Sequence, residues 1–135
     1  MIAYLYTTDK IESDQLEGFF VGWPNPPSRE THLRLLKNSD QIVVAIDTAN
    51  NKVVGFITAI TDHVLAAYIP LLEVLPEYQK QNIGTTLVSK MLEQLKDYYA
   101  VDLLCDENLQ PYYEHRGMRR ATGMFIRNYE RQSGI

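Results

Sequence analysis

The chain has a single cysteine, Cys105, among its 135 residues. One cysteine excludes an intrachain disulfide and favours a reducing compartment, so we expect a cytoplasmic protein. No apolar run approaches the roughly 20 residues that a membrane-spanning helix needs. Residues 1–6 also lack the basic start and the long apolar stretch of a signal peptide. We therefore expect neither a membrane span nor a secretory leader.

An excess of positive charge is missing as well. The formal net charge is −4 and the isoelectric point is about 5.3. Proteins that bind nucleic acid or anionic membranes favour a basic surface, so we expect neither partner. Five arginines lie late in the chain, and we interpret them as solvated strand and tail positions rather than as a polyanion site. They are Arg116, Arg119, Arg120, Arg127 and Arg131.

The order of predicted elements indicates the fold class. The length predicts one domain over residues 1–135. Strands are expected over residues 2–7, 41–47, 53–61, 64–75, 101–105 and 119–129, and helices over 28–37, 83–99 and 109–115. Residues 11–23 carry a loose helical stripe, and the prolines within 22–27 predict a loop. Short connections imply antiparallel hairpins, so we expect an α/β fold of the mixed α+β kind, with helices flanking the sheet.

Residues 72–87 are the most informative stretch. An apolar strand ends at Pro76, a short polar loop follows, and Gly84 opens a long amphipathic helix. Such a corner points free backbone N–H groups and the positive end of the helix dipole at one place, which suits a phosphate group. Gly84 would let the backbone approach that group closely, because it has no Cβ. The alternative is an ordinary strand–loop–helix corner whose glycine eases packing.

Two motifs carry a family resemblance. Gln79, Asn82 and Gly84 fall on the three named positions of Gln/Arg-x-x-Gly-x-Gly/Ala, the acetyl-CoA signature of the GCN5-related N-acetyltransferases (GNAT). Residues 108–118 resemble that family's Asn…Phe/Tyr-Tyr-Glu-x-x-Gly-Phe segment. The resemblance is specific from about residue 53 to residue 118. It implies the GNAT fold, with a mostly antiparallel sheet, and acetyl-CoA as the acyl-donor cosubstrate.

The resemblance also implies which residues bind the donor. They are Val74, Leu75, Gln79, Lys80, Gln81, Asn82, Ile83, Gly84, Thr85, Thr86, Asn108 and Tyr113. From residue 82 to residue 86 the contribution is backbone N–H groups, joined by the Thr85 hydroxyl, while Gln79 and Lys80 offer side-chain donors. Asn82 departs from the family's glycine, which could lower the affinity for CoA. Asparagine nevertheless tolerates the left-handed conformation better than most residues.

The strand before the loop should bind the pantetheine arm. By resemblance, the backbone of Val74 and Leu75 would hydrogen-bond the arm as an added strand would, and one of their N–H groups would face the thioester oxygen. Pro70 donates no ladder bond, so the strand should be an edge or carry a bulge there, which suits a sheet that parts to admit a ligand. A simple bend is the alternative.

Two residues are candidates for proton transfer. Tyr113 falls where the family commonly has the tyrosine that protonates the leaving CoA thiolate, although it could also simply pack. Glu73 is an acid within an apolar run, and it could act as general base or attract a cationic acceptor. The alternative for Glu73 is a structural pair with Arg or Lys. Asn108 would contact pantetheine or cap a helix, and capping is favoured.

The preferred interpretation is an acetyl-CoA-dependent N-acetyltransferase that acts on a primary amine by direct attack, without a metal. The alternatives are a non-catalytic acyl-CoA-binding sensor and an interaction domain that keeps only the fold. The acceptor is unidentified, and the acidic balance favours a cationic amine. The loop at residues 22–27, with Trp23, and Tyr68 are candidates to line its pocket. Asp62 and His63 are interpreted as turn residues, and a homodimer is compatible with the sequence.

Overall fold

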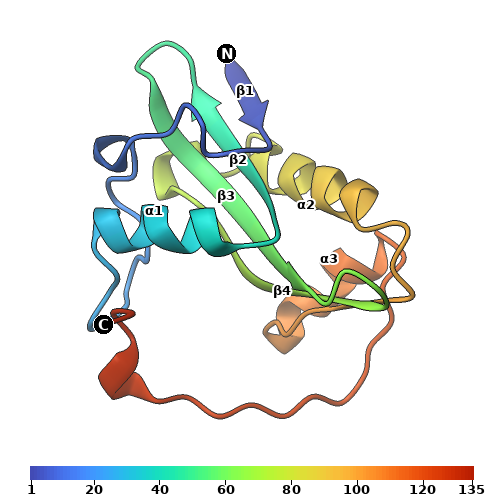
Figure 1. The fold of residues 1–135 in the computed structure, drawn as a ribbon. Coiled ribbons are helices and arrows are strands. Elements are labelled where there is room, and N and C mark those ends of the chain that lie inside the picture. The colour runs from blue at the N-terminus through green and yellow to red at the C-terminus, as the bar shows by residue number, and fades with distance from the viewer.

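A five-stranded sheet forms the centre of the protein in the computed structural model, which describes residues 1–135 (Figure 1). The strands lie in the sheet in chain order. The first four pair antiparallel and the fifth runs parallel to the fourth, so the predicted mixed, mostly antiparallel class is confirmed. The strands are β1 (Ile2–Leu5), β2 (Gln41–Asp47), β3 (Lys52–Thr61), β4 (Ala66–Val74) and β5 (Ala100–Asp102).

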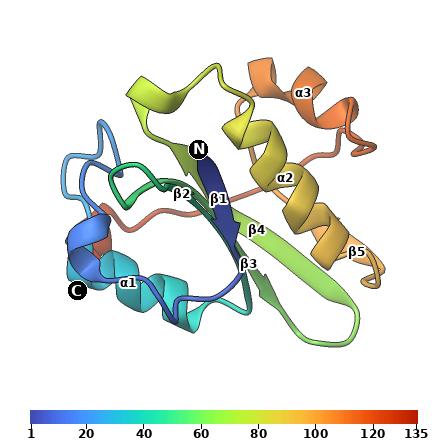
Figure 2. The ribbon, with the colours of Figure 1, turned by 90° about the horizontal axis from the view of Figure 1, so that it is seen from above.

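Helices α1 (Arg29–Asn38) and α2 (Ile83–Gln94) cover opposite faces of the sheet (Figure 2). Neighbouring residues of β3 show both contacts, because successive side chains of a strand point to opposite faces. The Phe56 ring meets the ring of His32 from α1, with 4.5 Å between the centroids. A Cβ at Gly55 would lie 3.1 Å from Leu87 Cδ1 of α2. A glycine at this position therefore lets α2 pack close to the strand.

The ends of both helices have local causes. Ser28 caps α1 as predicted, since its hydroxyl accepts the Thr31 N–H at 3.1 Å. The predicted extension of α2 to residue 99 is wrong, because the helix ends at Gln94. The chain then turns toward β5, and the Tyr98 hydroxyl bonds Thr61 Oγ1 at 3.3 Å. No helix combines the length and apolar character needed to cross a membrane.

Two predicted elements are absent. Residues 11–23 form a loop with only a 3₁₀ turn at Ser13–Gln15, because Gly18, Phe20 and Gly22 all have positive φ and interrupt any helix. Residues 119–128 form no strand, since no other strand lies beside them to pair with. We call residues 119–128 the strap. It follows the short helix α3 (Gln110–Glu114) and crosses to the C-terminal turn, a 3₁₀ turn at Tyr129–Arg131 beside α1 (Figure 1).

The predicted strand at residues 101–105 is shorter than expected, since β5 ends at Asp102. Cys105, which we expected at the end of this strand, lies beyond it and is partly exposed. The chain leaves the sheet after Asp102 and enters the 3₁₀ turn Glu107–Leu109 that precedes α3. This early departure opens one edge of β4.

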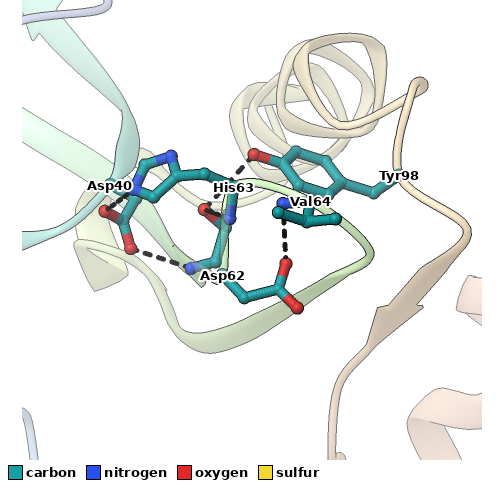
Figure 3. A network of polar contacts seen from close by, with 6 residues as sticks. Asp40, Asp62, His63, Val64 and Tyr98 are labelled. Atoms are coloured by element: carbon teal, nitrogen blue, oxygen red, sulfur yellow. Dashed lines mark hydrogen bonds and ion pairs between the residues drawn. The ribbon is translucent and has the colours of Figure 1, made fainter.

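The β3–β4 turn is held by the Asp62 carboxylate (Figure 3). It accepts the N–H groups of Ala66, Leu65 and Val64, and these bonds lower the pKa of Asp62 to about 2. His63 adopts a φ of 63° and places Nε2 3.0 Å from a carboxylate oxygen of Asp40. The prediction that Asp62 and His63 are turn residues is confirmed.

His32 is a buried histidine without a hydrogen-bond partner. It is 1% exposed, it packs among the rings of Phe19, Phe20 and Phe56, and neither ring nitrogen has a partner. Burial lowers its pKa from 6.5 to about 4. Below pH 6.5 the unfolded chain therefore takes up a proton that the folded chain excludes. Stability that is full above pH 6.5 should fall by about 3 kcal/mol as the pH drops to 4.

We expect the His32→Leu variant to lose this component of the pH dependence. Denaturant unfolding between pH 7 and pH 4 should show a shallower fall in the free energy of unfolding than in the wild type. His115→Leu removes an exposed histidine and is the matched control. Equal slopes for wild type and His32→Leu would show that His32 is not the group responsible.

Candidate active site

The second half of β4 has one open edge. β4 pairs with β5 only through Ala66, Ala67 and Tyr68, and then continues to Val74 beside β3 alone. The register with β3 shifts over the same stretch, because two residues of β4, Ile69 and Pro70, lie opposite one residue of β3. The predicted bulge at Pro70 is therefore confirmed, and the sheet parts there as expected.

The register decides which backbone groups face this opening. The Leu75 N–H donates to Val54 O of β3 at 2.9 Å, so the predicted role of Leu75 as a donor to the ligand is wrong. In an antiparallel pair, alternate residues direct their backbone groups toward and away from the partner strand. Val74 and Leu72 consequently turn their N–H groups to the open edge. The prediction at Val74 remains, and Leu72 is a position that we did not predict.

The start of α2 presents a row of unpaired donors. Every backbone N–H from residue 80 to residue 85 lacks a partner within the chain. Asn82, immediately before the helix, has φ 64° and ψ 14°, so it adopts the left-handed conformation that asparagine tolerates, as predicted. Lys80 also has a positive φ, 65°. Thr86 differs, because its N–H and its hydroxyl both bond Asn82 O, at 3.0 and 2.8 Å. The prediction of a free N–H at Thr86 is wrong.

Some side chains at the start of α2 already form hydrogen bonds within the chain. The Gln79 amide donates to Val74 O at 3.1 Å and so ties the loop to the end of β4. The Thr85 hydroxyl lies 3.2 Å from an Arg116 nitrogen and 3.4 Å from the Tyr112 hydroxyl. Lys80 and Gln81 are exposed. The loop is therefore braced on one side by β4 and on the other by α3.

Arg116 is a site residue that sequence reasoning missed, since we interpreted it as solvated. Its guanidinium stacks 3.7 Å from the Tyr112 ring centroid and donates to Tyr112 O at 2.7 Å. Its Nε is buried without a partner, and no carboxylate pairs with it. A cation beside the positive end of α2 is electrostatically unfavourable unless an anion binds there. The position of Arg116 beside the start of α2 follows from its contact with Thr85, which is seen only in the folded structure.

Tyr113 lies half-buried on α3. Its ring meets the Tyr112 ring edge-on, with 5.0 Å between centroids. Burial raises its pKa above the usual 10, so the phenol keeps its proton at neutral pH. Asn108 is exposed in the 3₁₀ turn before α3 and makes no cap hydrogen bond. The favoured capping role for Asn108 is wrong, and its contact with pantetheine stays a prediction.

Glu73 fastens the loop that follows the first 3₁₀ turn. Its carboxylate accepts the N–H of Phe20 at 2.8 Å and the N–H of Val21 at 3.2 Å. The alternative for Glu73 was a structural pair with Arg or Lys, but no Arg or Lys pairs with it. Its structural partners are backbone N–H groups instead, so it anchors the loop. Glu73 lies opposite Phe56 and thus on the α1 face, as alternation predicts. It holds Phe20 in its left-handed conformation, φ 61°.

A groove of about 500 Å³ opens on the same face, between α1, the loop and the C-terminal turn. Trp23 and Pro27 of the proline-rich loop line this groove, and Tyr68 lies outside it. Leu71 of β4 forms part of the floor, two residues before Glu73 and on the same side of the strand. The remaining lining residues are Phe20, Thr31, Arg34, Leu35, Asn38, Gln132 and Gly134.

Comparison with known proteins places this geometry in a family. A sequence model of the acetyltransferase (GNAT) family matches residues 8–118. GCN5-related N-acetyltransferase 3, chloroplastic, of Arabidopsis thaliana is 33% identical in an alignment of 97 residues that covers 67% of this chain and 41% of that protein. The chain thus spans less than half of that relative. The uncharacterized N-acetyltransferase ycf52 of Pyropia yezoensis is 28% identical over 90% of this chain and 75% of its own length.

Solved structures agree with the sequence matches. The crystal structure of a candidate acetyltransferase from Deinococcus radiodurans R1 superposes with a TM-score of 0.95 and 42% identity, over 99% of this chain and 93% of that one. A GNAT-family acetyltransferase from Streptococcus pneumoniae TIGR4 gives a TM-score of 0.75 and 28% identity, over 95% and 98%. The chain therefore belongs to the GNAT family of acetyltransferases.

Proposed function

We propose that this protein transfers the acetyl group of acetyl-CoA to a primary amine. One observation carries the proposal: six consecutive unpaired N–H groups and the Arg116 guanidinium meet at the start of α2, beside the open edge of β4. The N–H groups and the cation suit the pyrophosphate of CoA. The open edge suits the amide-bearing pantetheine arm, which can pair with Val74 and Leu72 as a strand would.

Residues at the end of β4, together with Tyr113 of α3, would supply the chemistry. The Val74 N–H would donate to the thioester oxygen as negative charge develops there during attack by the amine. The new N–C bond forms as the C–S bond breaks, and the Tyr113 hydroxyl would give its proton to the departing thiolate. The proton that the amine loses would pass to Glu73 or to water. The groove beside Glu73, with its Phe20 and Trp23 walls, is the proposed acceptor site.

Calorimetric titration with acetyl-CoA tests donor binding. We expect micromolar binding by the wild type, and about tenfold weaker binding by Arg116→Gln, because that variant removes a charge-assisted contact to phosphate. Arg29→Gln removes an exposed arginine of α1 and should bind like the wild type. No binding by the folded wild type would contradict the proposal. Unchanged binding by Arg116→Gln would show that the pyrophosphate of CoA does not bind beside Arg116 at the start of α2.

A non-catalytic acyl-CoA sensor is the second candidate. It is favoured by the two backbone bonds that already occupy the Glu73 carboxylate. Release of free thiol from acetyl-CoA in the presence of a panel of primary amines separates the two functions. Amine-dependent release supports the enzyme, whereas tight binding with no release by any amine supports the sensor.

A further inference from the structure

The groove beside Glu73 has one charged side chain in its lining, and that charge is positive. Arg34 of α1 lines the groove, and the lining includes no Asp, Glu, Lys or His. Arg34 is exposed and forms no ion pair within the chain. The net charge of the whole chain is −4, but the local charge of the groove would attract an anion.

Two side chains that line the groove keep hydrogen-bond donors free. Arg34 donates through Nη2 to Gly134 O at 3.2 Å, which fixes the guanidinium and leaves Nη1 without a partner. Gln132 accepts the Asn25 N–H through Oε1 at 3.0 Å, so its Nε2 group remains free to donate. A planar guanidinium and an amide N–H group are donors that suit a carboxylate. The single charge of Arg34 also matches the single charge of a carboxylate.

The rest of the groove is mostly apolar. The rings of Phe20 and Trp23 lie 4.8 Å apart between centroids and form one wall. Leu35 of α1 and Leu71 of β4 add aliphatic surface. Sugar hydroxyls would lose hydrogen bonds to water against such walls, which is costly. An apolar body is therefore favoured for the molecule that the groove binds.

The opposite charge lies beyond the groove floor, on β4. Leu71 and Glu73 share one side of the strand and lie about 7 Å apart along it. The Glu73 carboxylate is fixed to the backbone of the loop, whereas Arg34 is fixed to Gly134, and no ion pair joins the two side chains. An ammonium group would be drawn toward Glu73 and a carboxylate toward Arg34.

Resting on the acetyl transfer proposed above, we propose that the acceptor is an amino carboxylate. It would carry a primary amine and a carboxylate at opposite ends of an apolar body. Arg34 and Gln132 would bind the carboxylate, and the amine would lie toward Glu73. The amine nitrogen takes the acetyl group from acetyl-CoA and loses one proton, and CoA leaves as the free thiol. Arg34 is thus the residue that would set the acceptor specificity.

Acetylation of matched amines tests this specificity. 6-Aminohexanoate and hexylamine differ chiefly in the carboxylate, as do 4-(aminomethyl)benzoate and benzylamine. We expect the wild type to show at least about tenfold higher kcat/KM for each acid than for its uncharged-tail partner, because a charge-assisted contact is gained. Arg34→Gln should raise KM for the acids by about the same factor and leave the two simple amines unchanged. Lys37→Gln removes an exposed cation of α1 outside the groove and should keep the preference.

Reversal of the charge gives a readout that a merely structural role of Arg34 would not move. Arg34→Glu should reject both acids, because like charges then face each other. It should instead favour 1,6-diaminohexane, whose second ammonium group would lie where the carboxylate was. Thermal unfolding should show a folded variant, since Arg34 is exposed and its one hydrogen bond is at the surface.

The outcomes separate this inference from the proposed function. Equal kcat/KM for acids and simple amines in the wild type, or a preference that persists in Arg34→Gln, would overturn the amino carboxylate and leave acetyl transfer intact. If the wild type acetylates no amine, calorimetric titration of both acids into the CoA-saturated protein decides. Binding that is lost in Arg34→Gln supports the site, and no binding overturns it. Failure of acetyl-CoA itself to bind would contradict the proposed function instead.

Discussion

The Gly84→Trp variant is expected to fold normally and to lose at least about 100-fold in affinity for acetyl-CoA, which corresponds to about 2.7 kcal/mol. The fold does not itself require glycine at this position. An added Cβ would meet only Val74 Cγ2, at 3.7 Å, which is an ordinary contact, and φ is not positive. An indole there would instead project over the unpaired N–H groups at the start of α2. Calorimetric titration measures the loss, and thermal unfolding checks the fold.

Two further variants sharpen this test. Gly84→Ala adds a single methyl group and should weaken binding by a smaller factor than tryptophan does. Ser89→Trp places the same indole on an exposed position of α2, farther along the helix, and should bind like the wild type. Wild-type affinity in Gly84→Trp would show that the donor does not lie over the start of α2. Unfolding of the variant would show instead that the glycine serves packing.

The Tyr113→Phe variant is expected to lower kcat by about 10²- to 10⁴-fold, the usual contribution of a positioned general acid. Its affinity for acetyl-CoA should stay close to that of the wild type, because the ring still packs against Tyr112. Tyr112→Phe is the matched control, since it removes only a hydroxyl that lies 3.4 Å from Thr85. Steady-state kinetics with a reactive amine give kcat, and an unchanged kcat in Tyr113→Phe would assign the proton to water.

Glu73→Gln distinguishes a base from an anchor. The amide can keep one acceptor oxygen for the Phe20 N–H but loses the acceptor for Val21, at a cost of about 1 kcal/mol in stability. An anchor predicts this loss with kcat nearly unchanged at saturating amine. A general base predicts that kcat falls as well and that the acidic limb of the pH–rate profile disappears.

Local chemistry made several parts of the site predictable. The left-handed Asn82, the bulge at Pro70 and the helix start near Gly84 each follow from the conformational limits of one residue type. Whether the N–H of Val74 or that of Leu75 faces the open edge could not be predicted, because it depends on which residue of β3 lies opposite. Strand pairing sets that register, and the residues of β4 alone do not.

The positions that sequence reasoning missed are those that depend on distant contacts. Arg116 was interpreted as one of a set of solvated strand and tail arginines, whereas Thr85, which it contacts, is 31 residues away. The strap has the apolar residues that favour strands, but a strand exists only where another strand pairs with it. Residues 11–23 have a helical stripe, yet Glu73, far along the chain, binds the loop at Phe20.

The parted sheet also bears on solubility. Unpaired strand edges promote edge-to-edge aggregation, and proteins blunt them with prolines, bulges and side chains that occupy backbone groups. β4 has all three, since Pro70 lies in the bulge and the Gln79 amide occupies the outward carbonyl of Val74. The open edge of β4 would admit the pantetheine arm. Without the proline, the bulge and the Gln79 amide, the same edge would be prone to pair with strands of other molecules and to cause aggregation.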